Sequence, residues 1–193
     1  LFSQQMQYIK EHGYEVISLD KLGRMMREGI DIPRNYLVLT FDDGYRDFYT
    51  DAFPILKEYG FNATIFLTTG FLGSEGYMKC LTLEQVEELA KDDLIDIGAH
   101  TLNHPLLPLL PLQEIREEIF LSKQILEKRF KVAVSSFCYP CGALNNSIKE
   151  IVKEAGYETA AATAYHRGQY KDNDLYALKR VFVSNVSRYP LAF

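Results

Sequence analysis

Residues 36–45 read YLVLTFDDGY, an apolar run followed at once by two carboxylates and a glycine. The β-branched and aromatic residues of Tyr36–Phe41 predict a buried strand, and Gly44 permits a tight turn into a helical pattern over Asp47–Tyr59. Burial of charge is costly unless the charge is paired or bound to a metal. Because adjacent like charges push their pKa values apart, Asp42 and Asp43 can act as a base and a ligand. The simpler interpretation is a turn that caps the next helix.

Length and composition describe one globular domain spanning residues 1–193. The chain is 47% hydrophobic and 24% charged, the balance of a soluble protein. Its net charge of -5 argues against nucleic-acid binding through a broad basic surface. No apolar run approaches the roughly 20 residues of a membrane span. An odd count of three cysteines predicts no disulfide framework and leaves the compartment open.

Helical and strand patterns alternate along the chain. We predict helices over residues 3–12, 19–28, 47–59, 82–91, 111–130 and 145–155. We predict strands over residues 16–19, 36–41, 63–68, 94–99, 133–139, 158–163 and 177–184. This alternation implies parallel strands joined by helical crossovers, in a β/α barrel or an open doubly wound sheet. In both folds ligands gather at the carboxyl ends of the strands.

A pair of histidines follows one of these strand ends. His100 and His104 come directly after the predicted strand that ends at Ala99. Two histidines four residues apart in one turn can face a single metal ion. The pair is not the zincin pattern, since no glutamate follows His100. With one aspartate it would make a two-histidine, one-carboxylate set that leaves positions open for water and substrate. The alternative is a surface turn with a capping histidine.

The third strand end carries SFCYPCG, residues 136–142. Cys138 and Cys141 have the spacing of a thioredoxin-like redox site, where a helix amino terminus lowers a thiol pKa. Half of a zinc site is another interpretation, but it needs a second cysteine pair and only Cys80 remains.

Together the three motifs resemble those of the polysaccharide deacetylases, the family 4 carbohydrate esterases. The matching residues are TFDDG at 40–44, His100-Thr101-x-x-His104, and Phe137-x-x-Pro140-x-Gly142, within a span from Tyr36 to about Ser184. The resemblance implies a distorted (β/α)7 barrel and a divalent metal, usually Zn²⁺, with Co²⁺ or Ni²⁺ as alternatives. It implies hydrolysis of the N-acetyl groups of N-acetylglucosamine units, or less often of O-acetyl groups.

The resemblance also implies roles for single residues. Asp43, His100 and His104 would be the metal ligands, and Asp42 the catalytic base. The third motif would contact substrate and hold the oxyanion through the main-chain N–H of Cys141. The residues of that motif are Tyr139, Pro140, Cys141 and Gly142.

An acetylated polysaccharide or oligosaccharide is the implied partner, and an extracellular or cell-surface location follows from it. The motifs do not distinguish biofilm polysaccharide, peptidoglycan, chitin-like polymer and xylan. Two other functions stay open on the sequence. One is a sugar-binding or scaffold protein that kept the metal and lost catalysis. The other, more distant, is a thiol–disulfide protein that uses Cys138 and Cys141.

This chain departs from the family pattern in its third motif. Cys138 stands where the motif commonly has an arginine, and Cys141 where it has an aromatic residue. The arginine normally contacts the catalytic base. Arg180, on the last predicted strand, is our candidate replacement, with a structural salt bridge as the alternative.

A second departure concerns the general acid. The late Leu-x-His motif is absent after Val183. In a permuted branch of the family, resembling the poly-N-acetylglucosamine deacetylases, the acid histidine lies on a strand before the first motif. Residues 2–14, FSQQMQYIKEHGY, resemble the segment that follows that strand. The chain begins LFS, without methionine or signal peptide, so we expect a trimmed amino terminus with the acid just upstream of Leu1. His12 and His166 are the remaining candidates.

Overall fold

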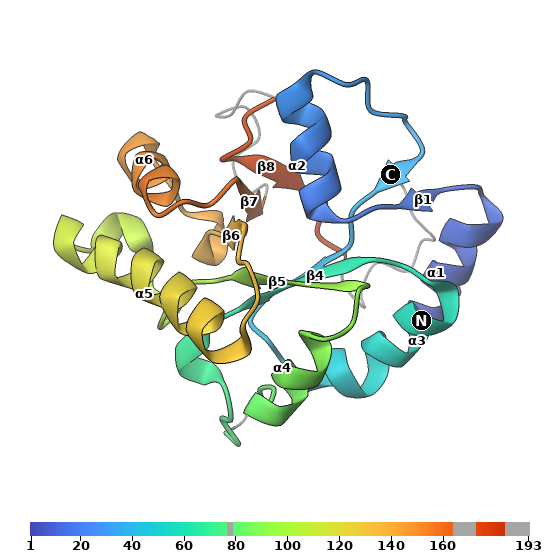
Figure 1. The fold of residues 1–193 in the computed structure, drawn as a ribbon, viewed down its shortest axis with the longest axis horizontal. Helices are drawn as coiled ribbons and strands as arrows, with labels where there is room; N and C mark the ends of the chain where they lie inside the picture. The colour runs from blue at the N-terminus through green and yellow to red at the C-terminus, as the bar shows by residue number, and fades with distance from the viewer. Residues whose placement is uncertain (77–78, 164–172, 184–193) are drawn as a thin grey trace.

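The computed structural model describes residues 1–76, 79–163 and 173–183 (Figure 1). These residues form a six-stranded parallel sheet in the order β3-β4-β5-β6-β7-β8, so each strand lies beside the next one along the chain. The sheet curls into a half-barrel, and helices cross over between its strands. The strands are β3 (Thr40–Phe41), β4 (Ala63–Leu67), β5 (Ile95–Ala99), β6 (Ser136–Cys138), β7 (Thr159–Thr163) and β8 (Leu178–Arg180). The prediction of a distorted β/α barrel is confirmed.

The helices follow the predicted pattern closely. They are α1 (Phe2–Glu11), α2 (Leu19–Glu28), α3 (Phe53–Tyr59), α4 (Leu83–Leu89), α5 (Leu112–Phe130) and α6 (Asn146–Glu154). The capping box at the start of α4 is present, with Thr82 and Gln85 each bonding the other's backbone N–H. None of these described helices is long and apolar enough to cross a membrane.

Short helical turns occupy several of the connections. A π-helical turn, η1 (Phe48–Ala52), precedes α3, so the predicted helix over 47–59 is irregular in its first half. The 3₁₀ turns are η2 (Thr69–Phe71), η3 (Leu107–Leu109) and η4 (Pro140–Gly142).

The single buried strand predicted over Tyr36–Phe41 is wrong. The run is divided between β2 (Tyr36–Leu37), which pairs with β1 (Glu15–Val16) in a separate two-stranded sheet, and β3. The reason is a change of partner: the carbonyl of Leu37 accepts from Ile17, whereas that of Leu39 accepts from the N–H of Thr64 on β4.

Three other predicted strands are shorter in the structure. The strand over 16–19 ends at Val16, because Ser18 caps α2 with its hydroxyl. Strands β6 and β8 are the central parts of the predicted 133–139 and 177–184, and Ser184 lies outside the described residues.

The two faces of the curled sheet carry different side chains. Because strand residues alternate in direction, Ile65, Ile97 and Phe137 point outward into the main core with α1 and α3–α6. Between them, Phe66 and Cys138 point inward with Ala161 and pack on Leu19 of α2. The inner face therefore leads, at the carboxyl ends of its strands, to the predicted site residues.

Candidate metal and catalytic site

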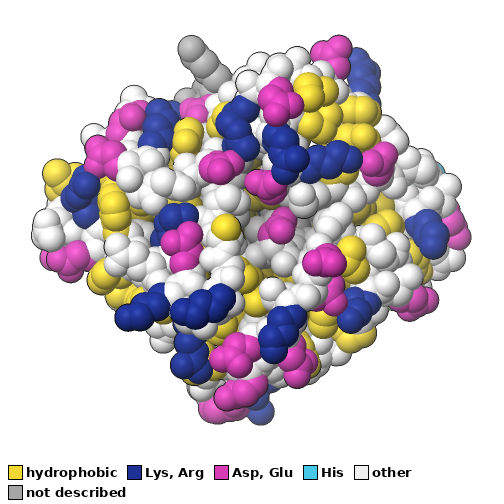
Figure 2. All heavy atoms as spheres, in the orientation of Figure 1, with side chains coloured by type: hydrophobic (Ala, Val, Ile, Leu, Met, Phe, Trp, Pro, Cys, Tyr) yellow, Lys and Arg dark blue, Asp and Glu magenta, His cyan; other side chains and the backbone are white. Residues whose placement is uncertain are grey.

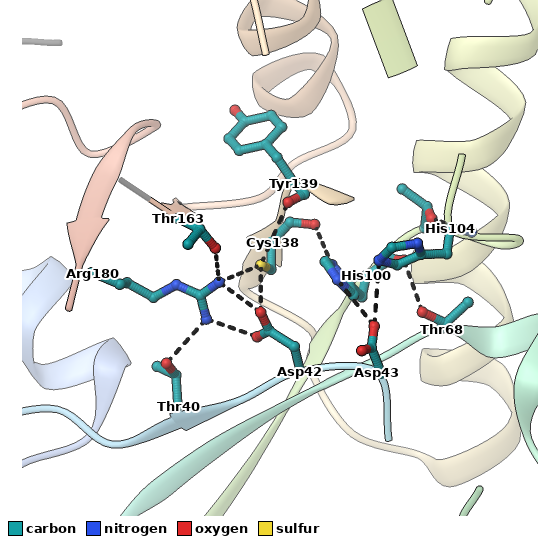
Figure 3. Close-up of polar contacts among 11 residues, drawn as sticks. Thr40, Asp42, Asp43, Thr68, His100, His104, Cys138, Tyr139, Thr163 and Arg180 are labelled. Carbon is teal, nitrogen blue, oxygen red and sulfur yellow. Dashed lines mark hydrogen bonds and ion pairs between the residues drawn. The ribbon is translucent and has the colours of Figure 1, made fainter. Parts of the chain in front are cut away.

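Residues from four parallel strands meet at one edge of the sheet (Figure 3). Asp42 and Asp43 follow β3, and His100 follows β5. Cys138 ends β6, and Arg180 ends β8. Parallel strands bring all their carboxyl ends to the same side, so residues up to 138 positions apart become neighbours.

Asp43, His100 and His104 point at one another. Asp43 Oδ1 lies 3.4 Å from His100 Nε2 and 3.4 Å from His104 Nε2. One donor atom from each of the three lies within 4.8 Å of the other two. Donors bound tetrahedrally at about 2.0–2.2 Å lie roughly 3.3–3.6 Å apart. The two measured separations therefore fit a single zinc-sized ion.

The protonation pattern of this group also fits a cation. The ring nitrogen Nδ1 of His100 lies 2.7 Å from the Cys138 carbonyl, which fixes Nδ1 as the N–H donor and leaves Nε2 as an acceptor. Burial lowers the pKa of His100, which favours the neutral imidazole that metals bind. Asp43 Oδ1 is buried and accepts no hydrogen bond from the described residues. A buried carboxylate oxygen without a proton donor beside two imidazole nitrogens needs a cation.

The backbone at these ligands is strained. Asp43 and His104 have φ values of 70° and 58°, in the left-handed region that non-glycine residues rarely adopt. Such conformations cost about 1–3 kcal/mol each and persist only where the surroundings enforce them. Their occurrence at two of the three donors supports a functional site at this edge.

Asp42 faces a different partner, the guanidinium of Arg180. Arg180 Nη1 donates to Asp42 Oδ1 and Nη2 to Oδ2, each at 2.7 Å, in a bidentate pair. Burial, the largest single contribution, would raise the pKa of Asp42. The hydrogen bonds and charge of Arg180, helped by His100 and Cys138, outweigh it and lower that pKa below its ordinary value. Asp42 is therefore ionised at neutral pH.

Arg180 also joins the strands around it. Its Nη1 donates to Thr40 Oγ1 at 3.1 Å, and its Nη2 donates to Thr163 Oγ1 at 3.2 Å and to Cys138 Sγ at 3.1 Å. The small Cys138 side chain leaves room for the guanidinium to arrive from β8. These contacts with β3, β6 and β7 hold the guanidinium in place. Arg180 therefore presents a fixed pair of donors to Asp42.

A second cluster, of Asp42, His100 and Cys138, also has metal-ligand composition. Its carboxylate and thiol are already bonded to Arg180. A metal ion there would meet a guanidinium at short range, and like charges repel strongly when partly buried. Electrostatics therefore disfavours a cation at this second cluster and leaves Asp43 and the two histidines as the candidate metal site.

The third motif contributes little side-chain surface to the site. The Tyr139 ring is fully buried, and its hydroxyl donates to the carbonyl of Tyr176 at 2.9 Å. Pro140 and Gly142 are buried, and a Cβ on Gly142 would meet the Thr163 carbonyl at 2.6 Å. Cys141 is exposed and lines the same cavity as the three donors. Of these four residues, Cys141 is the one that faces the cavity.

The cysteines do not fit dithiol chemistry. Cys138 is completely buried, and burial raises the pKa of its thiol well above the ordinary value. Redox-active cysteines instead have lowered pKa values, because the thiolate is the reactive form. Cys80, Cys138 and Cys141 are all free thiols in the structure.

The donors and Asp42 lie in a cavity of about 1040 Å³, a size that accommodates a substantial ligand. Its lining includes the aromatic residues Phe2, Phe41 and Phe182. On the face in Figure 2, Lys and Arg side chains are interspersed with Asp and Glu rather than gathered in one patch.

Tyr45, a cavity residue beside Asp43, is given no role by the sequence analysis. Burial, together with the charge and hydrogen bonding of Asp43, raises the pKa of Tyr45 to about 12. Its hydroxyl therefore stays protonated beside a metal-ligand candidate. The signal was its position directly after Gly44 in the first motif.

Of the two remaining acid candidates, His12 is the one that the described residues include. His12 ends α1, exposed, with its ring stacked on Tyr8 at 3.6 Å and Nδ1 2.9 Å from the Tyr8 carbonyl. It is not among the residues that line the cavity. His166 lies outside the described residues. The identity of the acid stays a prediction.

Comparison with known proteins defines the class. The model of the polysaccharide deacetylase family matches residues 20–160, more than half of the chain, and this protein belongs to that family. It is 32% identical over 183 residues to the putative polysaccharide deacetylase YxkH of Bacillus subtilis, across 95% of this chain and 64% of that protein.

One further relative and one solved structure are also similar to this chain. The poly-β-1,6-N-acetyl-D-glucosamine N-deacetylase of Staphylococcus epidermidis is 27% identical over 196 residues, covering 95% of this chain and 66% of that protein. The structure of the Streptococcus pyogenes deacetylase PplD in complex with acetate superposes with a TM-score of 0.83 at 31% identity, covering 94% and 79%. The chain spans slightly less than two thirds of the length of the Bacillus subtilis and Staphylococcus epidermidis relatives.

Proposed function

We propose that this protein is a metal-dependent hydrolase that removes acetyl groups from the N-acetylglucosamine units of a polysaccharide. The observation that carries the proposal is the pair of aspartates, one facing two histidines and the other facing Arg180. Family membership supports the reaction class. The name of the Staphylococcus epidermidis relative supports the choice of an amide-linked acetyl group on a glucosamine polymer.

Asp43, His100 and His104 would hold the metal. One carboxylate and two imidazoles suit Zn²⁺, with Co²⁺ or Ni²⁺ as alternatives. When bound, a divalent ion would supply Lewis acidity to the acetyl carbonyl and to the attacking water. Among the described residues, none donates a hydrogen bond to Asp43 Oδ1, which supports this assignment.

Asp42 is the proposed general base, and Arg180 its partner. The bidentate guanidinium holds both carboxylate oxygens, so the side chain has one orientation toward the cavity. A carboxylate with a lowered pKa is a weak base. It would therefore take a proton only from water whose acidity has been raised. The role of Asp42 thus depends on the neighbouring metal-ligand candidates.

The main chain at Cys141 is the proposed oxyanion contact. Cys141 lines the cavity with the donors, and its φ of 54° turns the backbone of η4 at this point. Main-chain N–H groups aimed at developing negative charge stabilise the transition state. Tyr139, Pro140 and Gly142 would act by shaping this turn, since all three residues are buried.

We infer that residues 1–19, which precede the matched region, belong to the same domain. Met6 and Ile9 of α1 lie in the main core and pack beside α3. The proposed substrate is an acetylated extracellular polysaccharide, such as a biofilm polymer, and the proposed location is outside the cell or at its surface. The aromatic residues that line the cavity agree with stacking against sugar rings.

Acetate release from N-acetylglucosamine oligomers tests the proposal. The protein is loaded with Zn²⁺, and acetate is measured before and after the metal is removed with a chelator. Metal-dependent release, greatly reduced in Asp42→Asn, is the expected result. Binding of the oligomer without acetate release at full metal loading would instead indicate a sugar-binding scaffold.

A further inference from the structure

Glu118 is the only acidic side chain among the buried residues of the described chain, with 8% of its surface exposed. It lies on α5, in a stripe of residues that face the rest of the protein. The other buried members of that stripe are Ile115, Ile119, Ser122, Leu126 and Phe130. A buried carboxylate is costly unless its oxygens accept hydrogen bonds, so its contacts indicate what it does.

The hydrogen bonds that the Glu118 carboxylate accepts from the described residues all come from the loop between the two candidate metal-ligand histidines. Glu118 Oε2 accepts from the backbone N–H of Leu102 at 2.9 Å and of Asn103 at 2.8 Å. Oε1 accepts from Asn103 Nδ2 at 2.7 Å. Three hydrogen bonds to one carboxylate are strong enough to offset its burial. They join the middle of α5 to residues 101–103.

The carbonyl groups of the same loop are held from the opposite side. The N–H of Thr69 donates to the Thr101 carbonyl at 3.2 Å, and the N–H of Gly70 to the Leu102 carbonyl at 2.7 Å. A Cβ on Gly70 would lie 2.6 Å from that carbonyl oxygen, so this close approach requires glycine. The loop is therefore clamped between η2 and Glu118.

The clamp maintains a strained conformation. Thr101 has φ 67° and His104 has φ 58°, and the N–H of His104 donates to Thr101 Oγ1 at 2.9 Å. Two left-handed non-glycine residues within four positions revert to relaxed conformations unless the loop is over-determined. Without Glu118, the N–H groups of Leu102 and Asn103 lose their protein acceptor.

The two histidines depend on this loop to different degrees. His100 is 2% exposed; its N–H donates to the Leu67 carbonyl and its ring to the Cys138 carbonyl. His104 is 26% exposed and lies beyond the strand, at the far end of the loop. The loop conformation therefore sets where His104 Nε2 lies relative to Asp43 Oδ1.

We propose that Glu118 is a positioning residue for the metal site. Its carboxylate holds residues 101–103 in the conformation that presents His104 to the ion shared with Asp43 and His100. This inference rests on the metal site of the proposed function. It assigns to α5, which lies between the second and third motifs in the sequence, part of the affinity for the metal.

The test is the affinity of the metal-free protein for Zn²⁺ alone, measured by competition with a chromophoric chelator. Replacement of a residue that orients a metal ligand typically weakens metal binding about 10–100-fold, and we expect this from Glu118→Ala. Glu118→Gln keeps the size and one acceptor oxygen, so a smaller loss, of roughly threefold to tenfold, is expected. Glu117→Ala is the matched control, because Glu117 is exposed and its side chain, among the described residues, hydrogen-bonds only to Gln113 on the same helix.

A merely structural role would lower the melting temperature but leave the site unchanged in folded protein. Affinities are therefore compared well below the unfolding temperature of each variant, and the Co²⁺ absorption spectrum is recorded as a report on ligand geometry. Wild-type affinity and spectrum in folded Glu118→Ala would overturn the proposal. If that variant does not fold, the same result in Glu118→Gln overturns it. Wild-type protein that binds Zn²⁺ but releases no acetate would contradict the deacetylase proposal and not this one.

Discussion

Asp42 and Asp43 share a peptide bond, yet they belong to two different parts of the site. Asp43 turns toward His100 and His104, and its Oδ1 accepts no hydrogen bond from the described residues. Asp42 turns toward Arg180, which bonds both of its oxygens. The positive φ of Asp43 separates the two directions. Identical side chains thus acquire different roles from their partners, and each half of the site can be perturbed alone.

The largest effect is expected on the base side, from Asp42→Asn. The amide cannot accept the proton, and a positioned base typically contributes about 10²–10⁴-fold. Acetate release at saturating oligomer should fall by that factor. The change should appear in kcat with little change in KM, because a base acts in the transition state. A comparable rise in KM with kcat preserved would show that Asp42 binds substrate instead.

On the metal side, His100→Ala should weaken Zn²⁺ binding by at least about 100-fold, beyond the range typical of groups that only orient a ligand. His100 is almost completely buried and fixed by the Cys138 carbonyl, so no other side chain can replace it. Isothermal titration of metal-free protein with Zn²⁺ measures the change. His12→Ala is the control, since His12 is exposed and outside the cavity. Equal affinities in all three proteins would remove the metal assignment.

Arg180→Lys should have an intermediate effect, again confined to the base side. Lysine keeps the charge but not the planar pair of donors. Loss of charge-assisted hydrogen bonds worth about 1.5–3 kcal/mol corresponds to a fall in kcat of roughly 10–150-fold. Zn²⁺ affinity should stay at the wild-type value. Arg24→Lys, an exposed replacement on α2, controls for the substitution itself. A loss of metal binding in Arg180→Lys would mean that the two halves are not independent.

A third carboxylate sharpens the comparison, because among the described residues it faces neither a pair of histidines nor an arginine. Asp96 is on β5, and its Oδ2 is buried without a hydrogen-bond partner among the described residues. Burial, with a further contribution from Asp20, raises the pKa of Asp96 to about 6. An acid whose pKa is raised on folding opposes folding once it ionises, so its cost develops between about pH 4 and pH 6 and persists above that range.

Asp96→Asn should therefore stabilise the protein at pH 8 and have little effect near pH 4. The expected gain is about 1–2 kcal/mol in the free energy of unfolding, reduced for partial solvent screening. Urea denaturation at both pH values measures it, with the exposed Asp93→Asn as control. The same gain at both pH values would show that ionisation of Asp96 is not the cause.

Much of this architecture follows from local sequence. The alternation of periodicities predicts parallel strands, and strand ends predict where polar residues converge. Asp42, Asp43 and His100 lie together because they follow their strands directly, and His104 joins them across the short loop after His100. The division of residues 36–41 could not be predicted, since it depends on which strand lies beside each half, and that is set by residues elsewhere in the chain.

Long-range partners were harder to predict. The contact of Arg180 with Asp42 was a candidate only because the family arginine is missing at Cys138. Glu118 was overlooked because its helix reads as an ordinary amphipathic one. Its position three residues after Ile115 and one before Ile119 places a charge on the apolar stripe. A charged residue on such a stripe is a signal of a buried, partnered group.

The most direct test of the division between the two aspartates is the zinc content of Asp42→Asn and Asp43→Asn, purified side by side and equilibrated with the same free Zn²⁺. The structure predicts close to one ion per chain in Asp42→Asn, whose carboxylate faces Arg180, and strongly reduced content in Asp43→Asn, whose Oδ1 faces both histidines. Retention of zinc in Asp43→Asn together with its loss from Asp42→Asn would contradict the account, because the roles of the two residues would then be exchanged.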